Sequence, residues 1–152
     1  MLARCHRIVI GVLVVALPAC RAARGPAPLD SANDVCGSCR MVVSDQRFAS
    51  QIVAPNEDPQ FFDDMGCLAR YLATHDLSAR ARVYVADRRT AAWVPAERAV
   101  FTRIDAVSAA MGSHIVAHET AASRSADPEA AHGIPVDALA VFDGHLPGGG
   151  RP

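Results

Sequence analysis

The segment QFFDDMGCLARYLA, residues 60–73, decides the fold because it predicts a strand, a helix cap and a helix in direct succession. Two phenylalanines end the strand, residues 60–62, and two aspartates follow that can cap a helix. The next apolar side chains recur at the spacing of an amphipathic helix: Met65, Leu68, Tyr71 and Leu72. We therefore predict a helix from about Met65 to Ala73.

Further strands are predicted on both sides of this helix. Residues 47–54 (RFASQIVA) alternate apolar and polar side chains, and a turn cluster at residues 56–59 lets them form a hairpin with residues 60–62. The β-branched and aromatic content of RVYVA predicts a strand at residues 82–86. A helical turn at 95–98 and strands at 100–104 and 114–118 follow. The expected fold is α+β: a single domain with a small, mostly antiparallel sheet and one main helix.

The N-terminal segment is typical of a secretory signal peptide, residues 1–19. Two arginines precede an apolar run, residues 8–19, which is followed by Cys20. This run is shorter than the roughly 20 residues that a transmembrane helix needs. Leu17-Pro18-Ala19-Cys20 resembles a bacterial lipobox, so we expect acylation of Cys20 and an anchor on the periplasmic face of a bacterial membrane. The alternative is ordinary cleavage, which leaves Cys20 as a free thiol.

The rest of the chain divides by composition. Residues 20–34 are small, polar and proline-containing, which predicts a lipid-anchored flexible tether. Residues 35–120 are the expected α+β metal-binding domain. Residues 121–152 form an expected loop-rich C-terminal arm, and its last residues, LPGGGRP, are expected to be disordered.

The charge of the chain excludes one class of function. Without Arg4 and Arg7, 13 basic residues remain against 16 acidic ones, a net charge of −3, and there is no lysine. Nucleic-acid binding depends on clustered basic side chains that neutralise phosphates. We therefore expect no nucleic-acid partner.

Five cysteines are present. Cys5 leaves with the signal peptide and Cys20 is expected to be acylated, so Cys36, Cys39 and Cys67 remain. An odd number of cysteines in an oxidising compartment leaves at least one free thiol. We expect that this thiol has a function.

The segment CGSCRM, residues 36–41, is the densest group of potential ligands. A C-x-x-C pair serves redox exchange, zinc sites or copper sites. Redox pairs follow a strand at a helix start, and structural zinc takes four closed ligands, for which histidines would have to join Cys67. Met41 favours Cu(I), which binds thiolate and thioether sulfur. In an extended segment Cys39 and Met41 point to the same side, so they are the predicted ligands, with Cys36 in a second tier.

Met111 is the third predicted copper ligand, and it lies beside a glycine that permits a tight turn. His114 and His118 would share one face of a strand and are second-tier candidates, either as ligands or as acceptors of a thiol proton. Each has an ordinary alternative, a core side chain for the methionine Met41 and a solvated strand face for the histidines.

Three other polar or sulfur-containing residues are expected to be structural. Cys67 lies in the first turn of the predicted helix, where a buried core cysteine is the simpler interpretation. Asp63 and Asp64 are expected to cap the helix rather than bind metal, because hard carboxylates do not suit Cu(I).

Taken together, these motifs resemble the NosL family of nitrous-oxide reductase accessory lipoproteins. The matching features are the lipobox at Cys20, C-x-x-C-x-M at 36–41, FDDMGCLARYL at 62–72, VYVAD at 83–87, WVPAE at 93–97, and MGS at 111–113 with the strand after it. The resemblance implies a periplasmic Cu(I) chaperone that loads the copper–sulfide centre of nitrous-oxide reductase together with its ABC-type maturation complex.

The resemblance also bears on individual residues. It implies Cys39, Met41 and Met111 as the Cu(I) ligands, and it relates the fold to the N-terminal region of alkylmercury lyases. Arg40 stands where many members have a glycine, and the match is only loose after Glu119.

Two alternatives remain to a carrier without turnover. The first is an enzyme, either a thiol–disulfide exchanger that uses Cys36 and Cys39 or an organomercury-type lyase that uses Cys39 and Cys67. The second is a structural lipoprotein whose cysteines pair as a disulfide. Met41 has no role in thiol exchange and therefore favours the copper carrier.

Overall fold

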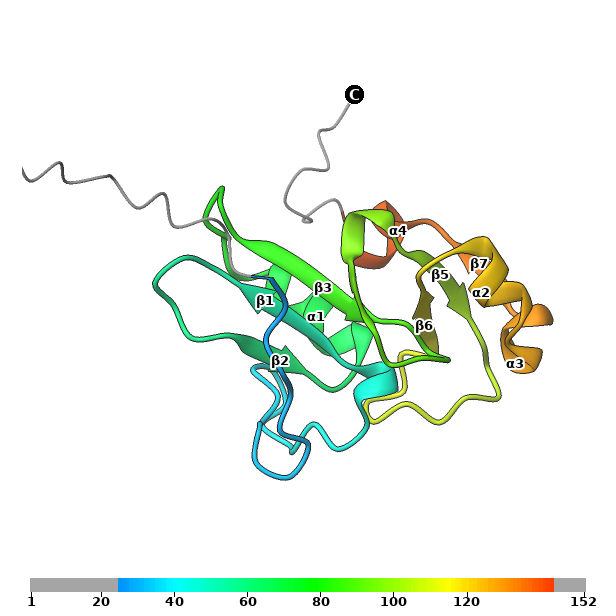
Figure 1. Ribbon diagram of the computed structural model, residues 1–152, viewed down its shortest axis with the longest axis horizontal. Coiled ribbons are helices and arrows are strands. Elements are labelled where there is room, and N and C mark those ends of the chain that lie inside the picture. The colour runs from blue at the N-terminus through cyan, green and yellow to red at the C-terminus, as the bar shows by residue number, and fades with distance from the viewer. Residues whose placement is uncertain (1–24, 144–152) are drawn as a thin grey trace, which may run out of the picture.

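The computed structural model describes residues 25–143 (Figure 1). The predicted signal peptide, the predicted acylation of Cys20 and the C-terminal LPGGGRP lie outside the described residues. Within residues 25–143, no helix is long and apolar enough to cross a membrane.

The strands of the described chain form two antiparallel sheets that lie side by side (Figure 1). The first has the order β2-β1-β3-β4 and comprises β1 (Ser50–Val53), β2 (Gln60–Phe62), β3 (Arg82–Ala86) and β4 (Trp93–Pro95). The second has the order β6-β5-β7 and comprises β5 (Val100–Arg103), β6 (Ile115–His118) and β7 (Ile134–Val136). The α+β class is confirmed, but the strands divide between two sheets instead of forming one.

The helices are α1 (Met65–Leu72), α2 (Ala121–Ser125), α3 (Pro128–Ala131) and α4 (Ala138–Phe142), with 3-10 turns at η1 (Gln46–Phe48) and η2 (Ala96–Arg98). The predicted main helix is confirmed as α1. The Asp64 side chain caps it by accepting a hydrogen bond from Gly66 N–H at 2.6 Å. Its apolar face packs against β1 and β2, and the predicted hairpin between these two strands is also confirmed.

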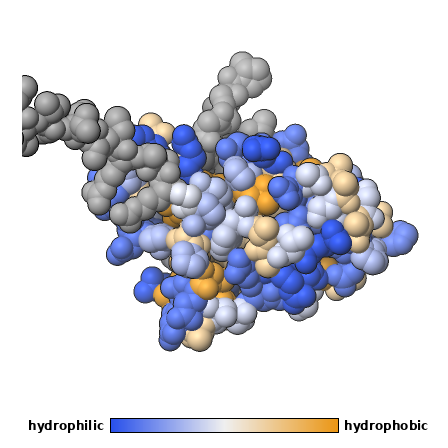
Figure 2. Space-filling model, in the orientation of Figure 1, coloured by the Kyte–Doolittle hydropathy of each residue, from blue (hydrophilic) through white to orange (hydrophobic). Residues whose placement is uncertain are grey.

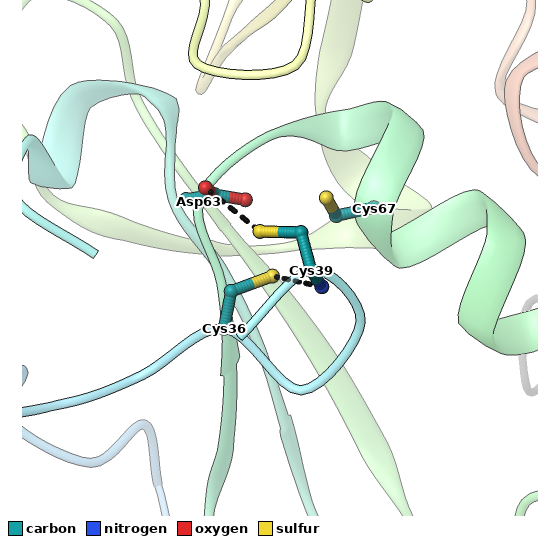
Figure 3. A group of neighbouring side chains, drawn as sticks. All are labelled: Cys36, Cys39, Asp63 and Cys67. Atoms are coloured by element: carbon teal, nitrogen blue, oxygen red, sulfur yellow. Dashed lines mark hydrogen bonds between the residues drawn. The ribbon is translucent and has the colours of Figure 1, made fainter. Parts of the chain in front are cut away.

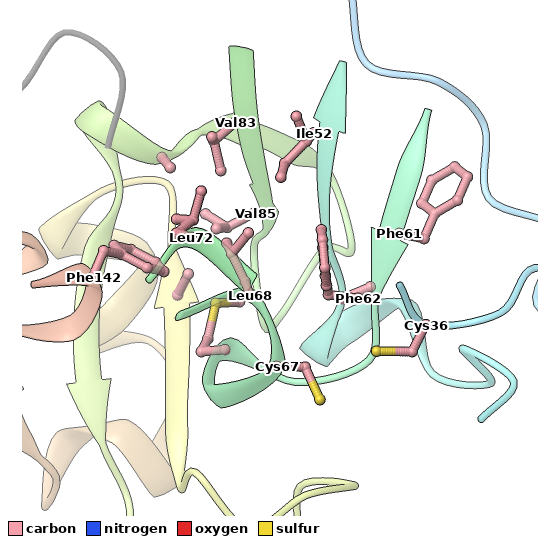
Figure 4. Packing of buried hydrophobic residues seen from close by; sticks show 14 of the residues in the cluster. Cys36, Ile52, Phe61, Phe62, Cys67, Leu68, Leu72, Val83, Val85 and Phe142 are labelled. Carbon is pink, nitrogen blue, oxygen red and sulfur yellow. The ribbon is translucent and has the colours of Figure 1, made fainter. Parts of the chain in front are cut away.

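The main core lies between α1 and the first sheet (Figure 4). Val83 and Val85 alternate along β3 and are buried, as the strand prediction required. Leu68 and Leu72 cover them from the helix. Each such side chain contributes about 1.5–3 kcal/mol on burial, so this face of α1 holds the helix in place.

The C-terminal arm is more ordered than predicted. The Phe142 ring is buried and packs edge-on against Phe101, with 5.4 Å between ring centroids, and Ala130 joins a second core cluster. The prediction of loop for residues 121–152 was therefore wrong in its described part. The short helices there are rich in alanine and bury only a few side chains, so they show no apolar periodicity.

The tether also differs from its prediction in the described residues. Ala27 exchanges two hydrogen bonds with the Gln51 side chain, at 2.8 and 3.0 Å, and Leu29 packs against the core. A buried amide side chain needs such partners, and the backbone of Ala27 supplies both. The later half of the segment 20–34 is thus packed on the domain.

Asp87 joins the two sheets. It lies at the end of β3, bridges to Ala117 of β6, and is buried. Its carboxylate accepts hydrogen bonds from Glu119 N–H and Ser123 Oγ–H, both at 2.7 Å. Burial by itself would raise the pKa of this carboxyl, but these bonds and those from the N–H groups of the following turn hold the pKa well below its usual range.

We predict that Asp87→Ala lowers the free energy of unfolding by about 2–3 kcal/mol at pH 7, because several buried donors lose their acceptor. The depressed pKa means that this contribution is present above the unfolded-state pKa of about 4 and is lost as pH falls through the lower folded-state value. The difference between wild type and variant should therefore shrink below about pH 4. Urea unfolding at pH 7 and at pH 3 measures it.

Asp76→Ala is the control, because Asp76 is exposed. Its effect should stay within about 0.5 kcal/mol at both pH values. Equal stability of wild type and Asp87→Ala at pH 7 would contradict the assigned role.

Candidate metal centre

Residues 36–41, named here the cysteine loop, form a closed turn. Cys36 N–H donates to the carbonyl of Met41 at 2.7 Å, which closes the loop on itself. Gly37 N–H donates to the carbonyl of Phe61 at 2.8 Å and attaches the loop to β2. The prediction of an extended segment was wrong, because these groups pair across the loop and with the sheet.

Four potential ligands converge between this loop and the start of α1 (Figure 3). The three sulfurs of Cys36, Cys39 and Cys67 and a carboxylate oxygen of Asp63 all lie within 4.8 Å of one another. Only Cys39 is partly exposed, and the other three are buried. We name this group the thiol cluster. Figure 4 shows Cys36 and Cys67 at one edge of the main core.

Hydrogen bonds connect the thiol cluster and support negative charge on it. The Cys39 thiol donates to Asp63 Oδ2 at 3.3 Å, and Cys39 N–H donates to the Cys36 sulfur at 3.5 Å. An Arg70 N–H donates to the Cys67 sulfur at 3.1 Å. In the described structure the second oxygen of Asp63, Oδ1, is buried and has no hydrogen-bond partner. A carboxylate oxygen of the cluster is thus left available.

The Cys39 and Cys67 thiols hold their protons more tightly than free cysteine does. Burial raises the pKa of Cys39, and it raises the pKa of Cys67 well above the usual range, with a further contribution from the neighbouring Asp63. A metal ion binds the thiolate form, so an ion that enters must displace protons from these sulfurs.

The two predicted methionine ligands are exposed side chains, 45% for Met41 and 42% for Met111. A cavity of about 190 Å³ is lined by Asp63 of the thiol cluster. It is also lined by Val42 and Ala110, the sequence neighbours of Met41 and Met111. The segments that carry the two methionines thus both border a cavity that reaches Asp63. Their roles as ligands remain predictions.

The loop that carries Met111 is held against the start of α1. Ser113 N–H donates to Asp64 Oδ2 at 3.2 Å. At Gly66 an added Cβ would lie 3.2 Å from the Ser113 Cβ and 2.9 Å from Asp64 Oδ1, so this position needs a glycine. The helix that places Cys67 thus also places the loop of Met111.

The two histidines predicted as second-tier candidates have other partners. His118 is fully buried, and its Nε2 lies 3.1 Å from Asp127 Oδ2. His114 Nδ1 lies 3.0 Å from the carbonyl of Val107. Neither histidine belongs to the four side chains of the described chain that converge.

A family model described as NosL matches residues 26–133. The chain belongs to the NosL family. Proteins of this family are copper-binding accessory proteins and are associated with periplasmic lipoproteins. No curated protein and no solved structure matched the chain.

In this NosL protein the sequence did not reveal two members of the thiol cluster, Asp63 and Cys67. Cys67 is buried as expected, and Asp64 is the cap, but Asp63 faces the thiols instead of capping α1. The spacing of four residues between Asp63 and Cys67 was the available signal, since such a pair lies on one side of a helix start. Nothing in the sequence indicated that the cysteine loop packs against this side of the start of α1.

Arg40 lies between two predicted ligands of this NosL protein and has a φ of 68°. This is the left-handed region, which costs an L-residue about 1–2 kcal/mol and which glycine adopts freely. A glycine at this position would adopt the same conformation without this cost. It also means that the turn carries local strain.

We predict that Arg40→Gly raises the free energy of unfolding by about 0.5–1 kcal/mol. Relief of the strain stabilises the folded state, and the larger conformational entropy of glycine in the unfolded chain offsets part of this gain. The matched control is Arg98→Gly, because Arg98 is also exposed but lies in η2 without a positive φ. It should destabilise the protein by about 0.5–1 kcal/mol. Thermal and urea unfolding measure both, and a loss of stability for Arg40→Gly would refute the strain.

Proposed function

We propose that this protein carries Cu(I) on Cys39, Met41 and Met111 and delivers it for assembly of the copper–sulfide centre of nitrous-oxide reductase. The observation that carries the proposal is the position of Cys39. It is the partly exposed thiol of an otherwise buried group of sulfurs, and Met41, two residues after it, is an exposed side chain. Family membership supports the copper-binding part of the proposal.

The ligand types suit a carrier of Cu(I). Thiolate and thioether are soft ligands that favour this ion over harder ones. A thioether binds more weakly than a thiolate, so an acceptor thiolate or imidazole can replace Met41 or Met111 first while Cys39 still holds the ion. An ion bound near the surface can therefore pass to another protein without being released to water.

The surface around the cysteine loop suits contact with an acceptor. Val35, Met41 and Val42 are exposed apolar side chains at its base, and Figure 2 shows hydrophobic atoms among hydrophilic ones at the end of the molecule where this loop lies. In the proposal the partners are nitrous-oxide reductase and its ABC-type maturation complex. An anchor at Cys20 would keep the protein on the periplasmic face of the membrane.

The ligand set is tested by competition between the reduced protein and a Cu(I)-specific chelator. We expect one Cu(I) per chain, bound far more tightly than Zn(II). Cys39→Ser should lower the affinity by more than about 100-fold and Met111→Ala by about tenfold, because one soft ligand is lost in each. Val35→Ala, at an equally exposed apolar residue, should bind like wild type. Full affinity of Cys39→Ser would refute the proposal.

The raised thiol pKa values predict that copper binding depends on pH. Each thiol that binds the ion loses one proton, so the apparent Cu(I) affinity should rise about tenfold per pH unit for each bound thiol below its pKa. Chelator competition at pH 6, 7 and 8 measures the slope. An affinity that is independent of pH would mean that no protonated cysteine binds the ion.

One enzymatic alternative also has a specific observation in its favour. The Cys39 and Cys67 thiols lie close to the Asp63 carboxyl, and an organomercury lyase needs two thiols and a nearby acid of this kind. In an organomercury lyase the thiols would bind mercury while a proton replaces it on carbon. Incubation with phenylmercury acetate distinguishes the two functions, since release of benzene requires the enzyme and its absence fits the carrier.

A further inference from the structure

We propose that Arg40 is the residue with which this protein recognises its copper acceptor, and that the group it pairs with is a carboxylate of that acceptor. The inference rests on the proposed carrier function for the identity of the partner, whereas the pairing is a property of the surface itself. It describes the acceptor chemically, as an apolar contact surface that carries an acidic side chain beside its own copper ligands.

Arg40 is an exposed cation between two predicted copper ligands in the sequence. Within residues 25–143 its guanidinium makes no ion pair, whereas Arg47, for comparison, pairs with Asp45 at 2.6 Å. A guanidinium offers five N–H donors in a planar fork that matches the two oxygens of a carboxylate. A carboxylate from another protein can therefore form a bidentate pair with Arg40 without displacing a partner within the described chain.

The backbone of Arg40 indicates a functional reason for this side chain. Its φ of 68° lies in the left-handed region, where glycine is free of strain and arginine is not. Strained residues of this kind cluster at functional sites. The turn needs only the backbone conformation, since the hydrogen bond that Arg40 contributes to the loop comes from its backbone N–H, which donates to the carbonyl of Cys36 at 3.0 Å. Folding of the cysteine loop therefore does not require an arginine here.

Exposed apolar side chains lie in and beside the cysteine loop. Among the described side chains, five large apolar ones are exposed, and three of them belong to this small region: Val35, Met41 and Val42. Val35 and Val42 face each other as an antiparallel pair, which backbone hydrogen bonds on both sides hold in place. Figure 1 shows the segment that contains the loop, in blue to cyan, projecting past β2 at one end of the molecule. Methionine and arginine are enriched in protein interfaces, and arginine is a frequent anchor within them.

A pocket next to Arg40 can receive the acidic side chain. It has a volume of about 520 Å³ and lies between the cysteine loop and the start of β2, where Gln60 adds amide N–H donors to its lining. Arg40 is the one cation among the described residues that line it. Asp34 is the one acidic residue of this lining, and its Oδ2 already accepts a hydrogen bond from Asp30 N–H at 2.8 Å. An incoming carboxylate would thus find its counter-charge in Arg40.

The position of Arg40 suits recognition better than tight binding. Arg40 directly follows Cys39, so a carboxylate paired with it brings the acceptor next to the proposed copper ligand. An exposed ion pair adds little affinity, but it steers the encounter of two proteins and fixes their orientation. Weak pairing also lets the two proteins separate after the ion has passed.

Two synthetic acceptor peptides test the charge of the partner. Both carry the same two cysteines as a Cu(I) site, which glutamates flank in one peptide and lysines in the other. Stopped-flow fluorescence at low ionic strength gives the second-order rate of Cu(I) transfer from the loaded protein to each peptide. The readout is the ratio of the glutamate rate to the lysine rate. Because each ratio compares two peptides with the same protein, a change in the Cu(I) affinity of a variant cancels.

Arg40→Glu should lower this ratio by about tenfold or more, because attraction of the glutamate peptide becomes repulsion. Arg40→Lys should lower it by less than about threefold, since the charge stays and only the bidentate geometry is lost. The matched control is Arg98→Glu, which changes the net charge equally at an exposed residue of η2 outside the pocket lining. Its ratio should stay within about twofold of wild type. An unchanged ratio for Arg40→Glu, or an equal fall for Arg98→Glu, would overturn the inference.

A copper-free arm separates this inference from the carrier function. The same peptides, labelled with a fluorophore, are titrated with the reduced, metal-free protein and followed by fluorescence anisotropy. A preference for the glutamate peptide that depends on Arg40, in a protein that binds no Cu(I), would refute the carrier and leave the docking residue standing. Copper transfer at a ratio that does not depend on Arg40 would overturn the docking residue and leave the carrier standing.

Far-UV circular dichroism checks that each variant is folded, and Arg40→Gln takes the place of Arg40→Glu if the latter does not fold. The absence of an Arg40-dependent preference in both arms would overturn the inference.

Discussion

The Asp64 carboxylate is fully buried, and each of its oxygens accepts a backbone hydrogen bond from a different part of the chain. One bond, from Gly66, fixes the start of α1. The other, from Ser113, fixes the loop that carries Met111. Because the residue before the cap and the first turn of the helix provide Asp63 and Cys67, the position of every ligand outside the cysteine loop depends on this one side chain. Because the Asp64 side chain is fully buried, water cannot take over its two hydrogen bonds.

The candidate metal centre is therefore built from two pairs of side chains that are held in different ways. Asp63 and Cys67 lie at the junction of β2 and α1, beneath the main core, and have little freedom to move. Cys36 and Cys39 belong to a loop that is closed by its own backbone bonds and attached to the sheet at Gly37. The main fold thus positions Asp63 and Cys67, whereas the hydrogen bonds of the cysteine loop position Cys36 and Cys39.

The parts of the fold that the sequence predicted are those determined by local pattern. The strand at 82–86, the hairpin that ends at Phe62 and the capped helix from Met65 all follow from side-chain periodicity and turn residues within a few positions. The division into two sheets, the packing of Phe142 and the approach of the cysteine loop to α1 depend on contacts between distant segments. No local pattern encodes them, which is why Asp63 and Cys67 were interpreted as structural residues although they lie beside Cys39, the predicted ligand.

With the predicted lipid on Cys20, the packing of Ala27 against Gln51 would limit how far the domain can stand from the membrane. A free chain from Cys20 to residue 34 could extend about 50 Å, at about 3.5 Å per residue. Because the chain is attached to the sheet at Ala27, its reach would fall to about 25 Å. An acceptor would then have to present its own metal ligands close to the membrane surface, within reach of the short segment between Cys20 and Ala27.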